Sequence, residues 1–302
     1  MATEGLAPGL IIGLREGIEA ALVIGIILGY LTKVRRSDLN RYVYGGTLGA
    51  ILASAGVAGL LFLLAVDFEN SAVEPLFEGF AIILAVLVLT SMIFWMMKAS
   101  KNISVHVQKR IDSLLVGSQV LGLAVLSFIV VFREGVETAL LMFGASAQTS
   151  RWEATAGVGL GLLLAGILGV GIVRLSWRIP LKQFFQVTGA ALVIIAAGLF
   201  ATGVHELQEG FGWAFGSSLV YDLSGVFPAG PENPLGYLLR GIVGYTDAPT
   251  VLEAFAYVGY WIFAAVVYLG IRTGKISLVT NPVRRFWRSL VPGRGKVPTE
   301  TE

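Results

Sequence analysis

The sequence contains seven runs of apolar residues that are each long enough to cross a lipid bilayer. A membrane-spanning helix needs about 20 such residues. Only 14% of the residues are charged, whereas an ordinary soluble domain has about 25%. We therefore predict an all-α polytopic membrane protein with seven transmembrane helices. The runs lie near residues 6–32, 43–66, 76–97, 119–147, 154–174, 182–204 and 251–271.

Basic residues are distributed unevenly between the segments that join these runs. Eighteen of the 22 follow the first, third, fifth or seventh run. Because basic residues accumulate on the cytoplasmic side of a membrane, we predict that the N-terminus lies outside and the C-terminus in the cytoplasm. Residues 1–275 are then one transmembrane domain, and residues 276–302 are a basic cytoplasmic tail. The tail suits anionic lipids better than nucleic acid, because it directly follows a span.

Two of the apolar runs contain the same charged phrase. Arg15-Glu16-Gly17-Ile18-Glu19 lies in the first run, and Arg133-Glu134-Gly135-Val136-Glu137 lies in the fourth. Charged side chains inside a membrane are energetically costly and usually functional. Ion pairs that merely join helices could explain one such phrase, but two copies favour a shared functional site.

The spacing of the phrases predicts their chemistry. Glutamates three residues apart differ by about 300° around a helix and about 4.5 Å along it, so they share a face. Each arginine precedes the second glutamate by four residues and can pair with it. Four carboxylates and two guanidinium groups leave a net charge of −2. Oxygen ligands without thiolates suit a hard cation, which leaves iron(III), iron(II), manganese, magnesium and calcium open.

The position of the phrases also predicts an internal repeat. They begin the first and fourth spans, so repeat one covers residues 6–98 and repeat two covers residues 119–204. Three spans in each repeat invert the second copy, a recurrent plan in transporters. The remaining residues form an outer interfacial segment, 205–250, and a seventh span, 251–271.

A second group of candidate ligands follows the sixth span. The stretch His205-Glu206-Leu207-Gln208-Glu209 repeats the spacing of two glutamates three residues apart, and Glu78 lies near the same end of the third span. An outer metal-loading site and a solvated helix end both remain open. A zinc hydrolase is disfavoured because the second histidine of its motif is missing.

The paired Arg-Glu-Gly-aliphatic-Glu phrase resembles that of the high-affinity iron permeases, also called oxidase-dependent iron transporters. Tyr221-Asp222-Leu223-Ser224 and Gly244-Tyr245 extend the resemblance over nearly the whole chain. Ile18 and Val136 stand where the family commonly has leucine, which leaves the charged atoms unchanged. The resemblance implies four iron ligands on the permeation path and two arginines that hold them. These are Glu16, Glu19, Glu134 and Glu137, with Arg15 and Arg133 in support.

The function expected from these features is inward iron transport across the plasma (inner) membrane by a multi-pass permease. The resemblance implies an extracytoplasmic iron-oxidising partner that supplies iron(III), and we expect no bound prosthetic group. Alternatives are a transporter of another cation, such as lead(II) or manganese(II), an intramembrane metal-dependent enzyme, and a metal sensor. No phosphate-binding loop is present, so ATP-driven pumping by this chain alone is disfavoured. Association into a homo-oligomer is left open.

Overall fold

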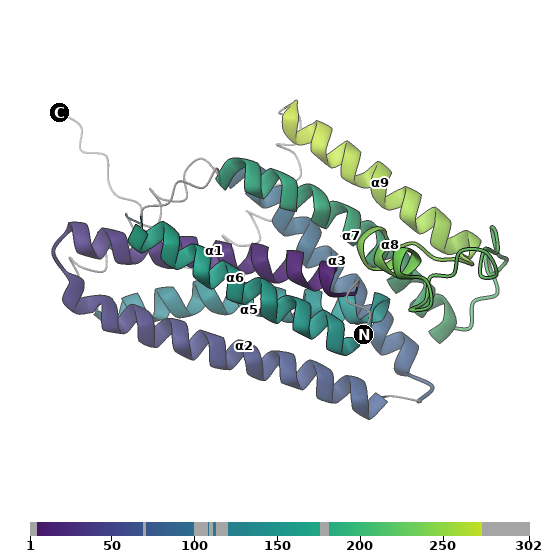
Figure 1. Ribbon diagram of the computed structural model, residues 1–302, viewed down its shortest axis with the longest axis horizontal. Helices are drawn as coiled ribbons and strands as arrows, with labels where there is room; N and C mark the ends of the chain where they lie inside the picture. Colours follow the sequence, from purple (N-terminus) through teal and green to yellow (C-terminus); the bar gives the residue numbers. More distant parts are fainter. Residues whose placement is uncertain are drawn as a thin grey trace, which may run out of the picture. The chain divides into compact units, whose positions relative to one another are not determined.

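The structure is a computed structural model that describes residues 5–68, 71–99, 108, 111–112, 120–175 and 181–273 (Figure 1). These residues form eight α-helices, one short 3-10 helix and a single isolated β-bridge, so the predicted all-α fold is confirmed. The helices are α1 (Leu6–Lys33), α2 (Asn40–Phe68), α3 (Glu74–Ala99), α5 (Val120–Gln148), α6 (Arg151–Leu175), α7 (Leu181–Gly210), α8 (Pro234–Val243) and α9 (Val251–Arg272).

The chain divides into two compact units, Met1–Trp261 and Ile262–Glu302. The boundary falls inside α9, and the second unit contributes the remainder of that helix to the described residues. The predicted basic tail, residues 276–302, and its expected lipid contacts lie outside the described residues.

Five helical segments are long and apolar enough to cross a membrane, which indicates a multi-pass membrane protein. They correspond to the second, third, fifth, sixth and seventh predicted runs. Helices α1 and α5 have 28 and 29 residues, but they are not among these five, because each carries the three charged side chains of one phrase. The count of seven spans stays a prediction that depends on these two helices. The five segments are Ser37–Val66, Glu74–Phe94, Arg151–Gly171, Gln183–Gly210 and Val251–Arg272.

The long helices pack in three main pairs, α1 with α6, α2 with α5, and α3 with α7. In the first pair, a Cβ at Gly157 would overlap the main-chain oxygen of Leu6. In the second pair, a Cβ at Gly46 would overlap the main-chain oxygen of Ala124. Glycine at these positions lets the two backbones touch. Helix α5 also contacts α1 and α3, so it lies at the centre of the arrangement.

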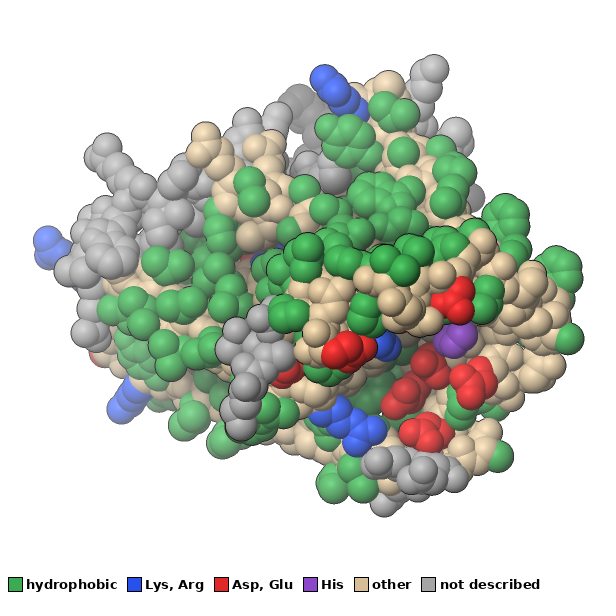
Figure 2. Space-filling view, turned by 45° about the vertical axis from the view of Figure 1, so that its right-hand side comes forward, with side chains coloured by type: hydrophobic (Ala, Val, Ile, Leu, Met, Phe, Trp, Pro, Cys, Tyr) green, Lys and Arg blue, Asp and Glu red, His purple; other side chains and the backbone are tan. Residues whose placement is uncertain are grey.

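Apolar side chains lie both inside and outside this helix assembly. Ile27 and Leu31 of α1, Val43 of α2 and Leu123 of α5 are fully buried in one core cluster. On the outer surface, Leu52 of α2 and Leu163 of α6 are among many exposed apolar side chains, and Figure 2 shows how much of one face they cover. A surface this apolar suits contact with lipid rather than water.

The segment after the sixth predicted span begins later than expected, because α7 continues to Gly210 and includes His205, Glu206 and Glu209. The segment contains one helix, α8, which Tyr237 anchors. Its hydroxyl donates to Oε2 of Glu153 at 2.6 Å and accepts from the main-chain N–H of Ser150 at 3.0 Å. Burial and the hydrogen bond to Glu153 raise the pKa of Tyr237. Helix α8 is thereby tied to the start of α6.

Candidate metal centre

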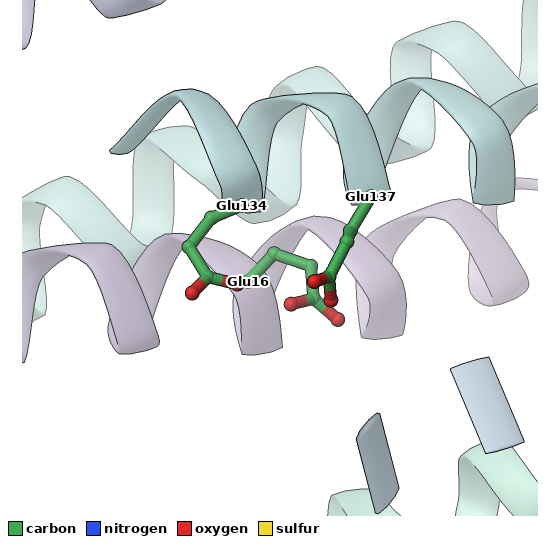
Figure 3. A group of neighbouring side chains, drawn as sticks. All are labelled: Glu16, Glu134 and Glu137. Carbon is green, nitrogen blue, oxygen red and sulfur yellow. The ribbon is translucent and has the colours of Figure 1, made fainter. Parts of the chain in front are cut away.

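Three glutamates from two helices point toward one another (Figure 3). Glu16 lies on α1, and Glu134 and Glu137 lie on α5. One carboxylate oxygen of each lies within 4.8 Å of the other two, and the residues are 1%, 6% and 9% exposed. Oxygens on opposite sides of one hard cation are separated by up to about 5 Å. The three carboxylates are therefore close enough to share an ion after small adjustments.

The glycine inside each phrase lets its helix pack closely against a neighbour. A Cβ at Gly17 would lie 2.5 Å from the Cβ of Ala165 on α6. A Cβ at Gly135 would overlap the Oγ of Ser54 on α2. Because residues three apart share one face of a helix while the residue between them points elsewhere, these contacts leave the glutamate faces of α1 and α5 free to meet.

Arg15 is enclosed by groups from two helices. Its Nη1 lies 2.8 Å from Oε1 of Glu16, and its Nη2 lies 3.1 Å from Oε1 of Glu19. Nη1 also donates to Sδ of Met92 on α3 at 3.6 Å. The Arg15 side chain is only 2% exposed, so it is a fixed positive charge beside the site.

Arg133 makes the corresponding ion pairs in the second phrase. Its Nη2 lies 3.0 Å from Oε1 of Glu134, and its Nε lies 3.2 Å from Oε1 of Glu137. The predicted pairing of each arginine with the glutamate four residues later is therefore confirmed in both helices. The surroundings differ, because the Arg133 side chain is 45% exposed.

Oε2 of Glu16, Glu134 and Glu137 is buried and accepts no hydrogen bond from the part of the chain that the structure describes. Buried polar atoms normally have a partner, and an unpaired carboxylate oxygen is strongly unfavourable. A bound cation would supply that partner for all three at once. The group offers carboxylate oxygens alone, which suits hard cations such as iron(III), iron(II) or manganese(II).

Sequence reasoning predicted four glutamates at this site, and three of them converge. Glu19 lies outside the compact group and is held by Arg15. The contact of Met92 with Arg15 was not predicted, because a methionine in an apolar span looks like any core residue.

The second predicted group lies where α3 begins and α7 ends, and Figure 2 shows acidic side chains gathered beside a histidine there. Nδ1 of His205 lies 3.7 Å from Oε2 of Glu253, and Glu78 lies 4.0 Å from Arg151. Within the described ranges, His205, Glu206, Glu209 and Glu78 do not form a compact metal-binding group like that of the two phrases. They share one region but are not arranged as a preformed site.

The two outer stretches that extend the family resemblance are structured. Oδ1 of Asp222 accepts hydrogen bonds from the N–H and Oγ of Ser224, at 3.0 and 2.6 Å, which lowers the pKa of Asp222. Gly244 ends α8 with a φ of 73° and packs its Cα against Gly198 of α7. A left-handed backbone in so close a contact requires glycine.

Comparison with known proteins identifies similar sequences. The sequence model of the iron permease FTR1 family matches residues 6–280. A ferrous iron permease EfeU of Yersinia pestis is 33% identical over 263 residues, which cover 84% of this chain and 90% of that protein. The EfeU of Escherichia coli O6:H1 strain CFT073 is 35% identical over 266 residues, or 87% and 94% of the two chains. No solved structure matches.

Proposed function

Because this chain belongs to the iron permease FTR1 family, and is therefore an iron transporter rather than an enzyme, we propose that it carries iron inward across the plasma membrane through the glutamates of its two phrases. The observation that carries this proposal is the meeting of Glu16, Glu134 and Glu137, buried and with one unpaired oxygen each. These three would bind the ion directly. Glu19, which Arg15 holds beside this group, would be the fourth ligand.

The proposed architecture has seven spans, with α1 and α5 crossing the membrane as well, the N-terminus outside and the C-terminus in the cytoplasm. Two inverted repeats of three helices would place the two phrases side by side. Matched contacts support this arrangement. The contact of Gly157 with Leu6 corresponds to that of Gly46 with Ala124 when the two halves are exchanged. In the same way, the contact of Gly17 on α1 with Ala165 on α6 corresponds to the contact of Gly135 on α5 with Ser54 on α2.

The oxidation state of the iron has two candidates. The resemblance of the two phrases to those of the oxidase-dependent iron transporters implies iron(III), delivered by an extracytoplasmic oxidase. The similar proteins are named ferrous iron permeases, which favours iron(II) as the second candidate. Four ionised glutamates and two arginines leave a net charge of −2, so a divalent ion would neutralise the site, and a trivalent ion would leave one positive charge. A nearly neutral site is less costly to keep buried.

The acidic groups at the ends of α3 and α7 would act before this site. In the proposed orientation they face outward, where negative charge raises the local concentration of cations. Glu78, His205, Glu206 and Glu209 would then gather iron without forming a fixed coordination shell.

Uptake by purified protein in liposomes tests the proposed site. Glu134→Gln keeps the size of the side chain and removes a charge, and we expect it to reduce iron uptake at least about tenfold. Glu232→Gln, in the outer segment, is the matched control and should transport normally. Measurements with iron(II) under reducing conditions and with iron(III) citrate identify the oxidation state, and lead(II) and manganese(II) as competitors test selectivity. Uptake by Glu16→Gln and Glu134→Gln at the unmutated rate would exclude this site.

A further inference from the structure

A buried polar contact joins α5 to α7 among apolar side chains. Gln148, at the end of α5, is 3% exposed, and its Nε2 donates to Oγ1 of Thr202 on α7 at 3.4 Å. That distance is longer than the roughly 2.7–3.2 Å of an ordinary N–H···O hydrogen bond. Because buried polar groups normally have well-formed partners, an amide held this loosely calls for an explanation.

Gln208 on α7 shows how a buried glutamine with a structural role is bonded. Its Nε2 donates to the main-chain oxygens of Phe215 at 3.0 Å and Trp213 at 3.3 Å, and its Oε1 accepts from Oγ1 of Thr250 at 3.4 Å. Both ends of that amide are therefore occupied. Within the described part of the chain, the side chain of Gln148 makes one long hydrogen bond, so its amide retains the capacity for a further ligand.

Gln148 lies on the same face of α5 as the glutamates of the second phrase. It follows Glu137 by eleven residues, and Gly144 follows Glu137 by seven; both spacings return to nearly the same side of a helix. Gln148 therefore lies about 16 Å beyond Glu137 along the helix axis. At Gly144, between them, a Cβ would lie 3.6 Å from Ala85 of α3 and from Leu199 of α7. This face is thus loosely filled between the two polar side chains.

Thr202 connects this face to the acidic residues at the end of α7. Glu206 follows Thr202 by four residues and Glu209 follows it by seven, so all three share one face of α7. Thr202 and Glu206 are separated by about 6 Å along the axis. Polar side chains therefore follow α7 to Thr202, cross to Gln148, and continue on the face of α5 that carries the second phrase. In the proposed orientation, this row leads from the outer surface to the transport site.

We propose that Gln148 and Thr202 form a neutral binding step for the iron ion between the outer acidic residues and the glutamates, an inference that rests on the proposed transport site. An amide oxygen and a hydroxyl oxygen are suitable ligands for a hard cation, and here they replace part of its water shell. Because neither ligand is charged, the ion is held more weakly here than at the glutamates and moves on to them. Passage through a membrane protein requires steps that bind an ion without retaining it.

Two substitutions of similar size at Gln148 test the binding step. Initial uptake of iron(II) by purified protein in liposomes is measured under reducing conditions over a range of iron concentrations. Gln148→Leu removes the oxygen ligand, and we expect the half-saturation concentration to rise at least about threefold. Gln148→Glu adds a charged ligand, and because affinity increases with ligand charge, we expect half-saturation to fall at least about threefold. Its maximal rate should also fall, because a tighter step releases the ion more slowly.

Substitutions on α7 provide the second comparison. Thr202→Val should raise the half-saturation concentration as Gln148→Leu does, and Thr202→Ser, which keeps the hydroxyl, should raise it less. Thr188→Val is the matched control, because the Thr188 hydroxyl donates to the main-chain oxygen of Phe184 on its own helix at 2.9 Å. Thermal unfolding in detergent is measured for every variant, so that a loss of stability is recognised.

The direction of the shifts separates ion binding from a purely structural contact. If the hydrogen bond only joined α5 to α7, Gln148→Leu and Gln148→Glu would both weaken it and would shift half-saturation in the same direction. That result, or no shift in either variant, would overturn the binding step. Should the Gln148 variants fail to fold, equal half-saturation in Thr202→Val and Thr188→Val would overturn it as well. Failure of the glutamate site itself would appear differently, as normal uptake by Glu134→Gln.

Discussion

The sulfur of Met92 and Nη1 of Arg15 lie 3.6 Å apart, although they belong to different helices. The contact connects α3 to the phrase on α1. Arg15 in turn holds Glu16 at 2.8 Å and Glu19 at 3.1 Å. Met92 therefore helps, through Arg15, to fix the orientation of two glutamates.

Replacing Met92 with leucine should weaken iron transport modestly. Leucine preserves size and apolarity but cannot accept a hydrogen bond from Arg15, and the loss of one such contact is worth about 1 kcal/mol. We expect iron uptake in liposomes to fall by about fivefold, which corresponds to that energy. Met142→Leu, also at a buried methionine, is the control. Equal losses in the two variants would show that the contact with Arg15 has no special role.

The close contacts of the helix pairs predict that alanine substitutions at nearby glycines differ sharply in their effect on stability. A methyl group at Gly46 would overlap the backbone of α5, and one at Gly157 would overlap the backbone of α1. Gly45 and Gly159 have nothing within 4 Å of the corresponding position. Gly46→Ala and Gly157→Ala should each destabilise the protein by about 1–3 kcal/mol.

Thermal unfolding in detergent measures this difference. Gly45→Ala and Gly159→Ala should be neutral or slightly stabilising, because alanine favours a helix over glycine by about 1 kcal/mol. Similar unfolding temperatures for Gly46→Ala and Gly45→Ala would contradict the close packing of α2 on α5.

The repeated phrases allowed the meeting of glutamates from α1 and α5 to be predicted from sequence. Helical spacing placed Glu134 and Glu137 on one face, and the ion pair of Arg133 with Glu137, four residues later, was also predicted. The ion pair of Arg133 with the adjacent Glu134 was not predicted. The position of Glu19 outside the compact group could not be predicted. Glutamates with the same spacing along a helix can lie at different distances from the neighbouring helix, because these distances depend on the angle between the two helices. That angle is set by the packing of the whole fold.

The different surroundings of Arg15 and Arg133 could not be predicted from local sequence either. Arg15 and Arg133 have the same charged neighbours in the chain, so no sequence pattern distinguishes them. Their difference arises because α3 places Met92 against Arg15, whereas Arg133 continues an exposed row on α5. Helix boundaries were also missed where polar residues continued a helix, as at the end of α7.

The outer acidic group should affect the capture of iron more than the rate of its passage. Glu209→Gln removes one charge from the exposed part of this group, and because the field there concentrates cations, we expect half-maximal uptake to need about threefold more iron. The maximal rate should stay unchanged, since the two phrases are intact. Raised ionic strength should reduce the difference between variant and unmutated protein. A lower maximal rate at unchanged half-saturation would instead place Glu209 on the transport path itself.

Tyr237 should be the main attachment of α8 to the helix assembly. Its hydroxyl joins Glu153 and the N–H of Ser150, and Tyr237→Phe leaves both groups without this partner while keeping the ring. We expect a loss of about 1–3 kcal/mol in stability and faster hydrogen exchange of the main-chain amides of residues 234–243. Tyr221→Phe is the control, because the Tyr221 hydroxyl donates an exposed hydrogen bond to the main-chain oxygen of Thr246. If exchange in α8 is equally slow in both variants, the hydrophobic contacts of α8 rather than its hydrogen bonds hold it in place.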